Sequence, residues 1–207
     1  MIEPESTLDA IEAARVIAVI RAEDAATAVR TAEALLEGGI RAIELTFTTP
    51  GVEAPLRDLV ERHPEAVVGA GTVTTPEQAA AAAAAGAAFL ISPGSPPQLV
   101  EAMAATGLAT IPGCLSTTEI LTALDAGAHA IKIFPAALLG PGYVSALRGP
   151  FPSLRFIPTG GIEPADVPRW LEAGAFAVGI GGRLARPVRN DEDRRSVVEA
   201  ARALTAP

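Results

Sequence analysis

Lysine is almost absent from this chain of 207 residues: among its 16 basic residues only Lys132 is a lysine, and the others are arginines. Arginine stays protonated in proteins and cannot attack a carbonyl carbon, whereas a lysine amine can do so once desolvation favours its neutral form. The composition therefore restricts side-chain amine chemistry to one position. That position lies in the apolar run Ala130–Pro135, which has the pattern of a buried strand.

Cysteine and histidine are also scarce. Cys114 is the only cysteine, so no disulfide can form within the chain, and we expect a cytoplasmic protein. The two histidines, His63 and His129, have no spacing typical of a metal site, so we expect no bound metal. Aromatic residues make up 4% of the chain, which predicts a core of aliphatic side chains and alanine.

The excess of negative charge and the lack of long apolar runs exclude two kinds of partner. A formal net charge of -8 argues against nucleic-acid binding, which needs a basic surface. The apolar stretch Ala79–Ile91 is too short to span a bilayer and contains a glycine, so we expect no membrane association. The segment Met1–Ser6 lacks the charged-then-apolar pattern of a secretory signal.

What the chain does contain is a repeated unit of a short apolar strand, a loop rich in glycine, proline and threonine, and an alanine-rich helix. The predicted strands are Val16–Ile20, Ala42–Thr46, Val67–Ala70, Ala88–Ile91, Ala109–Ile111, Ala130–Ile133, Phe156–Pro158 and Ala175–Ile180. The predicted helices include Thr7–Ala14, Ala25–Glu37, Pro76–Ala85, Thr117–Ala126 and Pro164–Ala173. Strands that are apolar on both faces indicate a parallel sheet covered by helices.

The regular spacing of eight strand–helix units favours an α/β fold of the closed (β/α)8 type, a TIM barrel. We predict one such domain over residues 1–207, with an extra N-terminal helix before the first strand. An open doubly wound sheet is the alternative. It would favour a Gly-x-Gly-x-x-Gly turn after the first strand, where this chain has Arg21-Ala22-Glu23-Asp24.

Two ionisable residues interrupt apolar strands: Glu44 stands between Ile43 and Leu45, and Lys132 stands between two isoleucines. In a barrel of this kind the functional residues gather where the strands end. A carboxylate buried without a partner is costly, so Glu44 needs a partner or has a raised pKa. The pair could be a structural salt bridge, or a nucleophile and a general acid/base that act on one substrate.

Glycine pairs follow the last two predicted strands, Gly160-Gly161 and Gly181-Gly182. Backbone N–H groups and the start of a helix at Pro164 would bind an anion without a basic side chain. A phosphate site in these two loops recurs among barrels of this type. Tight turns with no ligand are the alternative.

Three more side chains at strand ends each have two interpretations. Arg21 could bind a substrate carboxylate or phosphate, or it could pair with Glu23 or Asp24 in a solvated turn. Thr72 could donate its hydroxyl to a carboxylate or cap the next helix. Arg183 could bind phosphate or lie in solvent.

Five segments stand in a characteristic order and spacing: Gly38–Thr46, Gly69–Thr72, Ser92–Gly94, Lys132–Pro135 and Pro158–Gly161. Together they make the chain similar to the class I 2-keto-3-deoxy-6-phosphogluconate (KDPG) aldolases and their 4-hydroxy-2-oxoglutarate (KHG) relatives. The resemblance implies a homotrimeric (β/α)8 barrel with no metal and no added cofactor. It also implies a carbon–carbon lyase that cleaves KDPG reversibly to pyruvate and glyceraldehyde 3-phosphate.

The resemblance also assigns roles to residues. It implies that Lys132 forms a Schiff base with the substrate and that Glu44 is the general acid/base. Thr72 and an arginine would hold the pyruvyl carboxylate; some members carry this arginine where this chain has Thr48, and we assign the role to Arg21. The phosphate would lie on the two glycine pairs. The expected substrate-binding residues are Arg21, Thr72, Pro93, Phe134, Thr159, Gly160, Gly161, Gly181 and Gly182.

Several activities stay open at this point. A sister family that cleaves the galactonate epimer tends to carry valine where this chain has Thr159, which favours the gluconate. The segments Pro112–Cys114 and Gly140-Pro141, however, resemble the sister family. Cleavage of KHG alone, binding of pyridoxal phosphate, and a phosphosugar-binding barrel without catalysis are further alternatives.

Overall fold

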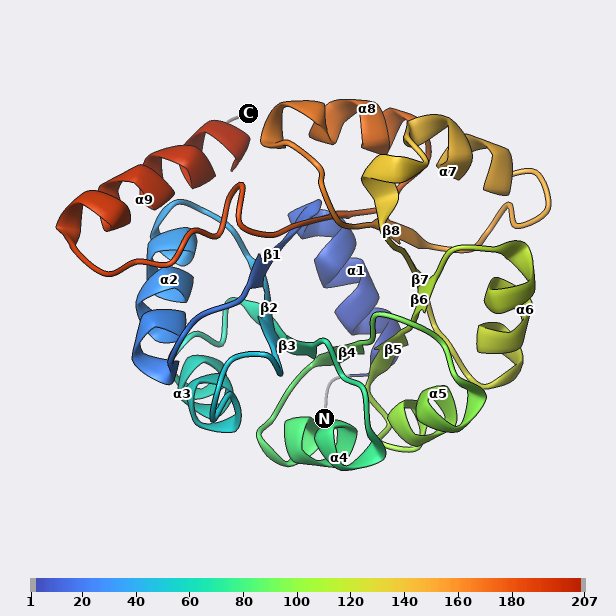
Figure 1. The fold of residues 1–207 in the computed structure, drawn as a ribbon, viewed down its shortest axis with the longest axis horizontal. Helices are drawn as coiled ribbons and strands as arrows, with labels where there is room; N and C mark the ends of the chain where they lie inside the picture. The colour runs from blue at the N-terminus through green and yellow to red at the C-terminus, as the bar shows by residue number, and fades with distance from the viewer. Residues whose placement is uncertain (1–2, 206–207) are drawn as a thin grey trace.

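The computed structural model describes residues 3–205, and Figure 1 shows strands at its centre with helices around them. In chain order the elements are α1 (Pro4–Ala14), β1 (Val16–Ile20), α2 (Ala25–Glu37), β2 (Ala42–Thr46), α3 (Glu53–Arg62), β3 (Val67–Gly71), α4 (Pro76–Ala84), β4 (Phe89–Ile91), α5 (Pro97–Ala104), β5 (Ala109–Ile111), β6 (Gly113–Cys114), α6 (Thr117–Asp125), β7 (Ile131–Ile133), the 3-10 helix η1 (Ala136–Leu138), α7 (Pro141–Leu147), β8 (Phe156–Pro158), the 3-10 helix η2 (Pro164–Asp166), α8 (Val167–Glu172), β9 (Val178–Ile180) and α9 (Asp191–Thr205).

The strands form two parallel sheets, one of six strands in the order β5-β4-β3-β2-β1-β9 and one of three in the order β6-β7-β8. The prediction of parallel strands covered by helices is therefore confirmed. Parallel neighbours place residues of the same depth side by side. In this register Val19 lies beside Glu44, and Gly113 lies beside Lys132.

Contacts at both edges link the two sheets. Pro112 alone separates β5 from β6. It has no N–H to donate, yet its carbonyl oxygen accepts a hydrogen bond of 3.0 Å from the amide of Lys132. At the other edge, Thr159 forms an isolated parallel bridge with Gly179 and so joins the end of β8 to β9. The result is an α/β fold with a curled, barrel-like parallel sheet.

Along each strand, side chains alternate between the interior of the curled sheet and the helices outside it. Leu8 and Ile11 of α1 are fully buried in one cluster with inward side chains of the strands. The members of this cluster that come from strands or their approaches are Ile17, Ala42, Phe89, Ile91, Ala109, Ile111, Ala130, Ile157, Phe176 and Ala177. Figure 1 shows α1 crossing behind the strands. Because side chains of one strand face the same way every second residue, the next inward layer begins two residues later.

Side-chain caps set several helix starts just beyond the strand ends. Asp24 caps α2 and Thr75 caps α4, each by accepting a hydrogen bond from a backbone N–H of the first turn. Ser116 and Glu119 form a reciprocal capping box at the start of α6. These caps fix where the chain turns from strand to helix, which is the edge from which the site is built.

Several predicted elements differ from those observed by one to three residues at their ends, and two differences have structural consequences. The strand predicted over Ala175–Ile180 begins only at Val178. The prediction of one helix over Pro164–Ala173 is wrong, because a 3-10 turn precedes α8. Pro168 explains the division, since proline is tolerated only in the first turn of an α-helix, and a helix beginning at Pro164 would place it further in. Within residues 3–205, no helix is both long and apolar enough to cross a membrane.

Candidate active site

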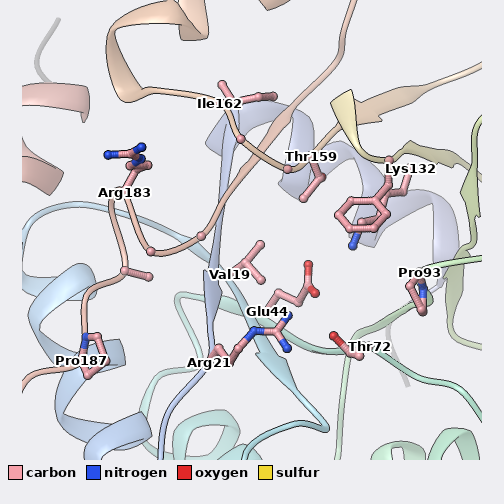
Figure 2. A pocket seen from close by; sticks show the side chains of 16 residues that line it. Val19, Arg21, Glu44, Thr72, Pro93, Lys132, Thr159, Ile162, Arg183 and Pro187 are labelled. Carbon is pink, nitrogen blue, oxygen red and sulfur yellow. The ribbon is translucent and has the colours of Figure 1, made fainter. Parts of the chain in front are cut away.

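Glu44 and Lys132 belong to the inward layer directly above the apolar one. Ala42 and Ala130 are fully buried in the apolar layer, and the two ionisable residues stand two positions further along the same strands. Strand alternation therefore points both side chains to the interior near the C-terminal ends of the strands. Figure 2 shows the carboxylate and the amine directed into one common space.

This space is a cavity of about 420 Å³. Its lining residues are Val19, Arg21, Glu44, Thr72, Pro93, Lys132, Phe134, Thr159, Gly160, Gly161, Ile162, Gly181, Gly182, Arg183, Ala185 and Pro187. All the site residues predicted from the sequence are among them. The structure thus brings these residues together, while the role of each stays a prediction.

Lys132 is 5% exposed, and among residues 3–205 its side-chain amine forms no hydrogen bond within 3.5 Å and no ion pair within 4.0 Å. Its Nζ lies 4.9 Å from the centre of the Phe134 ring, a cation–π distance. The interpretation of Lys132 and Glu44 as a structural salt bridge is not supported, since the two groups form no ion pair within that distance. A buried amine without a carboxylate partner is available to react.

Glu44 is 1% exposed, and its Oε1 atom is buried without a hydrogen-bond partner in the described part of the chain. Burial raises the pKa of the Glu44 carboxyl, and the positive charges of Lys132 and Arg21 offset part of this rise. Gly71 makes room for the carboxylate, because a Cβ atom there would overlap it. A buried, unsatisfied carboxyl with a raised pKa is suited to accept and return a proton.

Arg21 extends from the end of β1 and donates from Nη1 to Thr48 Oγ1 at 2.9 Å. The alternative in which it pairs within its own turn does not hold. Glu23 forms an ion pair of 2.7 Å with Arg189, and Asp24 caps α2. Arg21 is therefore left facing the cavity with a hydroxyl as its contact.

Thr72 has a left-handed backbone with a φ of 53°. This conformation is unfavourable for a β-branched residue, by about 1–2 kcal/mol. Thr72 follows β3 directly and lines the cavity, and Figure 2 shows it on the same side of the space as Arg21 and Pro93. Thr75, rather than Thr72, caps α4, so the capping alternative for Thr72 is wrong.

The glycine pairs form one wall of the cavity. Gly160 and Gly161 have φ values of 99° and 75°, a region that favours glycine. The 3-10 helix η2 begins at Pro164, so no α-helix starts there. The groups that could donate hydrogen bonds to an anion are therefore the backbone amides of the two loops. Arg183 forms an ion pair with Glu163, with 3.0 Å between Nε and Oε1, and the ion pair spans the two loops.

Sequence reasoning missed four lining residues: Val19, Ile162, Ala185 and Pro187. Val19 could have been found, since it stands two residues before Arg21 on the same strand face. The other three lie in loops whose course depends on tertiary contacts. Within residues 3–205, no group of three or more His, Cys, Asp or Glu side chains could hold a metal ion.

The model of the KDPG and KHG aldolase family matches residues 8–199 of the chain. The chain belongs to this family. This confirms the resemblance inferred from the five sequence segments. An aldolase of this family is a carbon–carbon lyase, and that class applies to this chain.

Three relatives illustrate the range of the family. A 2-dehydro-3-deoxy-phosphogluconate aldolase of Treponema pallidum (strain Nichols) is 44% identical over 156 residues, which cover 75% of this chain and 74% of the relative. A 2-dehydro-3-deoxy-6-phosphogalactonate aldolase of Escherichia coli (strain K12) is 33% identical over 192 residues, which cover 92% and 93%. A KDPG aldolase structure from Legionella pneumophila has a TM-score of 0.84 and 33% identity, and the match covers 98% of each chain.

Proposed function

We propose that this aldolase cleaves 2-dehydro-3-deoxy-6-phosphogluconate to pyruvate and glyceraldehyde 3-phosphate, reversibly, through a Schiff base on Lys132. One observation carries the proposal: the only lysine of the chain is buried, has no ion-pair partner within residues 3–205, and lines the same cavity as a buried carboxyl. The Legionella structure supports it, because that aldolase was captured with pyruvate as a covalent carbinolamine intermediate.

In the proposed reaction the Lys132 amine attacks the C2 ketone to give a carbinolamine, and loss of water gives a protonated imine. The C3–C4 bond then breaks, and its electron pair moves into the imine to form an enamine. The C4 hydroxyl loses its proton and becomes the aldehyde of glyceraldehyde 3-phosphate. Protonation of the enamine at C3, followed by hydrolysis, releases pyruvate and restores the amine.

Glu44 is the proposed proton carrier for these steps. It accepts the C4 hydroxyl proton as the bond breaks, through a water molecule, and returns a proton during imine formation and hydrolysis. Burial raises the pKa of the Glu44 carboxyl above its ordinary value, which makes its protonated form more accessible for returning a proton. Its Oε1 atom is buried without a hydrogen-bond partner among the described residues, which supports a catalytic rather than a stabilising role.

The substrate's two anionic ends would lie on opposite walls. Arg21 and Thr72 are proposed to bind the carboxylate, with Pro93 and Phe134 beside the reacting carbons. The phosphate is proposed to lie on Gly160, Gly161, Gly181 and Gly182, whose loops supply backbone N–H donors. Figure 2 supports this order, since Arg21 and Thr72 lie across the space from Ile162, which follows the first glycine pair.

The gluconate epimer is favoured by Thr159, whose hydroxyl lies at 3.4 Å from the carbonyl oxygen of Ile157 and borders the cavity. This is the position at which the galactonate family tends to carry valine. Cleavage of the galactonate epimer remains the second candidate, since the chain also matches that family over most of its length. Rates of cleavage of the two C4 epimers and of KHG, measured side by side, distinguish the three activities.

The finer architecture is also proposed. We propose that the strands close into an eight-stranded (β/α)8 barrel with α1 as the extra N-terminal helix, supported by the continuity through Pro112 and the Thr159–Gly179 bridge. We propose a homotrimer as well. Among the described residues, the exposed large apolar side chains all come from one segment: Leu115, Leu121, Phe134 and Leu138. Sedimentation equilibrium gives the mass that tests it.

The decisive experiment for the chemistry is reductive trapping. The protein is incubated with pyruvate and borohydride, and the modified peptide is identified by mass spectrometry. A reduced pyruvyl adduct on Lys132 is the expected result. Absence of an adduct from folded protein would contradict the Schiff-base proposal and favour a phosphosugar-binding barrel instead. The absorbance spectrum of the same sample tests for bound pyridoxal phosphate.

A further inference from the structure

A chain of hydroxyl groups leads from Arg21 to the backbone of its own strand. Arg21 Nη1 lies 2.9 Å from Thr48 Oγ1, and Thr48 Oγ1 lies 2.8 Å from Thr46 Oγ1. Thr46 Oγ1 in turn lies 3.0 Å from the carbonyl oxygen of Ile20. We infer that Thr48 and Thr46 are positioning residues that hold the Arg21 guanidinium in place for the carboxylate of the substrate. The inference rests on the proposed function of Arg21.

The direction of each hydrogen bond in this chain follows from the groups at its ends. A guanidinium can only donate, so Thr48 Oγ1 accepts from Arg21. A carbonyl oxygen can only accept, so the hydroxyl hydrogen of Thr46 points to Ile20. The hydrogen between the two threonines therefore belongs to Thr48. With these three hydrogen bonds assigned, Arg21 donates to Thr48, Thr48 donates to Thr46, and Thr46 donates to the carbonyl oxygen of Ile20.

The turn after β2 contacts the backbone on both sides of Arg21. Thr46 is fully buried at the end of β2, and Ile20 directly precedes Arg21. On the other side, Thr49 Oγ1 accepts a hydrogen bond of 3.1 Å from the amide of Ala22. The turn after β2 thus holds the backbone before and after Arg21 as well as its side chain.

This support matters because the arginine is otherwise unrestrained. Arg21 is an exposed side chain with several rotatable bonds, and among residues 3–205 it forms no ion pair within 4.0 Å. Ordering such a side chain on substrate binding costs conformational entropy. A hydroxyl that orients the guanidinium beforehand leaves its other N–H groups free for a carboxylate, which improves binding without touching the substrate.

The test compares Thr48→Val, which keeps the shape of the side chain and removes the hydroxyl, with Thr48→Ser, which keeps the hydroxyl. The measured quantities are the pyruvate concentration that gives half-maximal borohydride trapping on Lys132 and the trapping rate at saturation. We expect Thr48→Val to raise the half-maximal concentration by about tenfold, on the scale of one hydrogen bond to a charged group. The saturated rate should change less than about twofold, and Thr48→Ser should restore the wild-type concentration.

Two further variants separate the possible failures. Thr106→Val also removes a threonine hydroxyl, one that donates to the carbonyl oxygen of Met103 at the end of α5, but Thr106 does not line the cavity, so the half-maximal concentration should not change. Arg21→Met tests the proposed function: if pyruvate binding is unchanged in it, the carboxylate role of Arg21 fails. If Arg21→Met weakens binding but Thr48→Val does not, the positioning role alone fails.

The double variant completes the cycle. Once Arg21 is replaced by methionine, Thr48→Val should have no further effect, because the hydroxyl acts only through the guanidinium. Equal effects of Thr48→Val with and without Arg21 would mean that Thr48 merely supports the loop, and would overturn the inference.

Discussion

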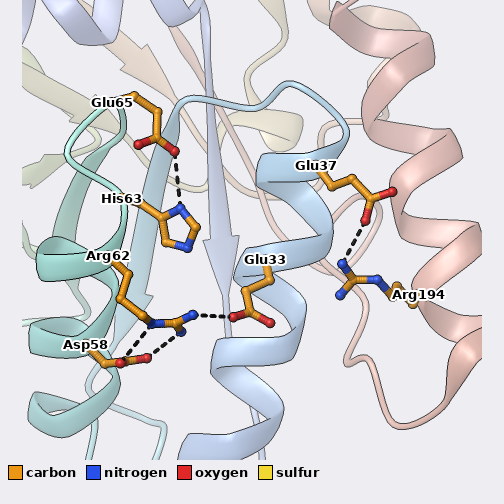
Figure 3. Close-up of polar contacts among 7 residues, drawn as sticks. All are labelled: Glu33, Glu37, Asp58, Arg62, His63, Glu65 and Arg194. Carbon is orange, nitrogen blue, oxygen red and sulfur yellow. Dashed lines mark hydrogen bonds and ion pairs between the residues drawn. The ribbon is translucent and has the colours of Figure 1, made fainter.

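The ionisable side chains on the outer face of α2, α3 and α9 form ion pairs, whereas Lys132 and Glu44 in the cavity do not pair with each other. On the outer face, Arg62 contacts Glu33 at 2.7 Å and also pairs with Asp58, while Arg194 contacts Glu37 at 2.7 Å. Figure 3 shows that the Arg62–Glu33 and Arg194–Glu37 pairs join neighbouring helices, while the Arg62–Asp58 pair lies within α3. In the cavity, Lys132 and Glu44 are buried and form no ion pair within 4.0 Å with any residue from 3 to 205.

The pKa values of the carboxyl groups express the same contrast. Hydrogen bonds from Arg62 lower the pKa of Asp58 on the outer face, whereas burial raises the pKa of Glu44 in the cavity. Exposed pairs contribute about 0–1 kcal/mol each, while a buried group without a partner costs about 1–3 kcal/mol. On this molecule the paired charges therefore contribute modest stability, whereas the buried groups without an ion pair are those for which we propose a catalytic role.

Replacing the amine tests the cavity side of this comparison most severely. Lys132→Arg keeps a positive charge but removes the nucleophile, so cleavage should fall by roughly 10³-fold or more. The variant should also give no adduct with pyruvate and borohydride. Circular dichroism and thermal melting control for folding. A folded variant with normal cleavage would refute the Schiff-base assignment.

Glu44→Gln removes the carboxyl that the mechanism uses and should lower the turnover number by about 10²–10⁴-fold. Trapping of pyruvate on Lys132 should persist, although more slowly. Steady-state cleavage assays and timed trapping measure the two effects. Loss of trapping with full loss of folding would instead indicate that Glu44 is a structural group.

The stability of Glu44→Gln at different pH values tests whether the pKa of Glu44 is raised in the folded protein. The folded-state pKa of Glu44 lies above its ordinary value of 4.5, so its stabilising contribution is present at low pH and is lost as the pH rises through the folded-state pKa. Glu44→Gln should therefore be more stable than the wild type at pH 8 by about 1–3 kcal/mol, and this gain should shrink toward pH 4. Urea unfolding at both pH values measures it; a gain that grows toward low pH would contradict the assignment.

Thr72→Gly should separate binding from stability. Glycine relieves the left-handed backbone at Thr72, so the free energy of unfolding should rise by about 0.5–1 kcal/mol. Half-maximal trapping should require about tenfold more pyruvate, because the hydroxyl is lost. Thr74→Gly in the same loop, where the backbone is not left-handed, should lower stability instead.

Arg62→Ala should have the smallest effect. Removing an exposed ion-pair partner should lower the free energy of unfolding by about 1 kcal/mol or less, and by less still in high salt. Cleavage kinetics should match those of the wild type. Urea unfolding at low and high salt, with a parallel assay, checks both. A large loss of activity would show that the outer face is coupled to the cavity.

The sequence was sufficient to predict features that repeat. Two ionisable residues in otherwise apolar strands, Glu44 and Lys132, predicted the site, and glycine pairs at the ends of the last two strands predicted the wall that the cavity shows. The bounds of β1, β2, β5 and β8 agree with the prediction because apolar runs and turn residues mark them locally.

What the sequence could not predict depends on contacts between distant segments. The left-handed backbone of Thr72, the hydroxyl chain from Arg21 and the pairing of Arg183 with Glu163 arise only when neighbouring loops meet. The division of the helix near Pro164 was predictable in principle, since Pro168 forbids a continuous α-helix from that start.

The packing of α1 under the strands decides how molecules move through this enzyme. Leu8 and Ile11 are fully buried and the inward residues beside them are buried, so within residues 3–205 this packing closes the side of the interior that α1 covers. Substrate and both products must cross the same face. In the proposed mechanism pyruvate stays covalently held on Lys132 until hydrolysis, so the aldehyde departs first and pyruvate last. Added pyruvate therefore competes with fresh substrate for the empty amine.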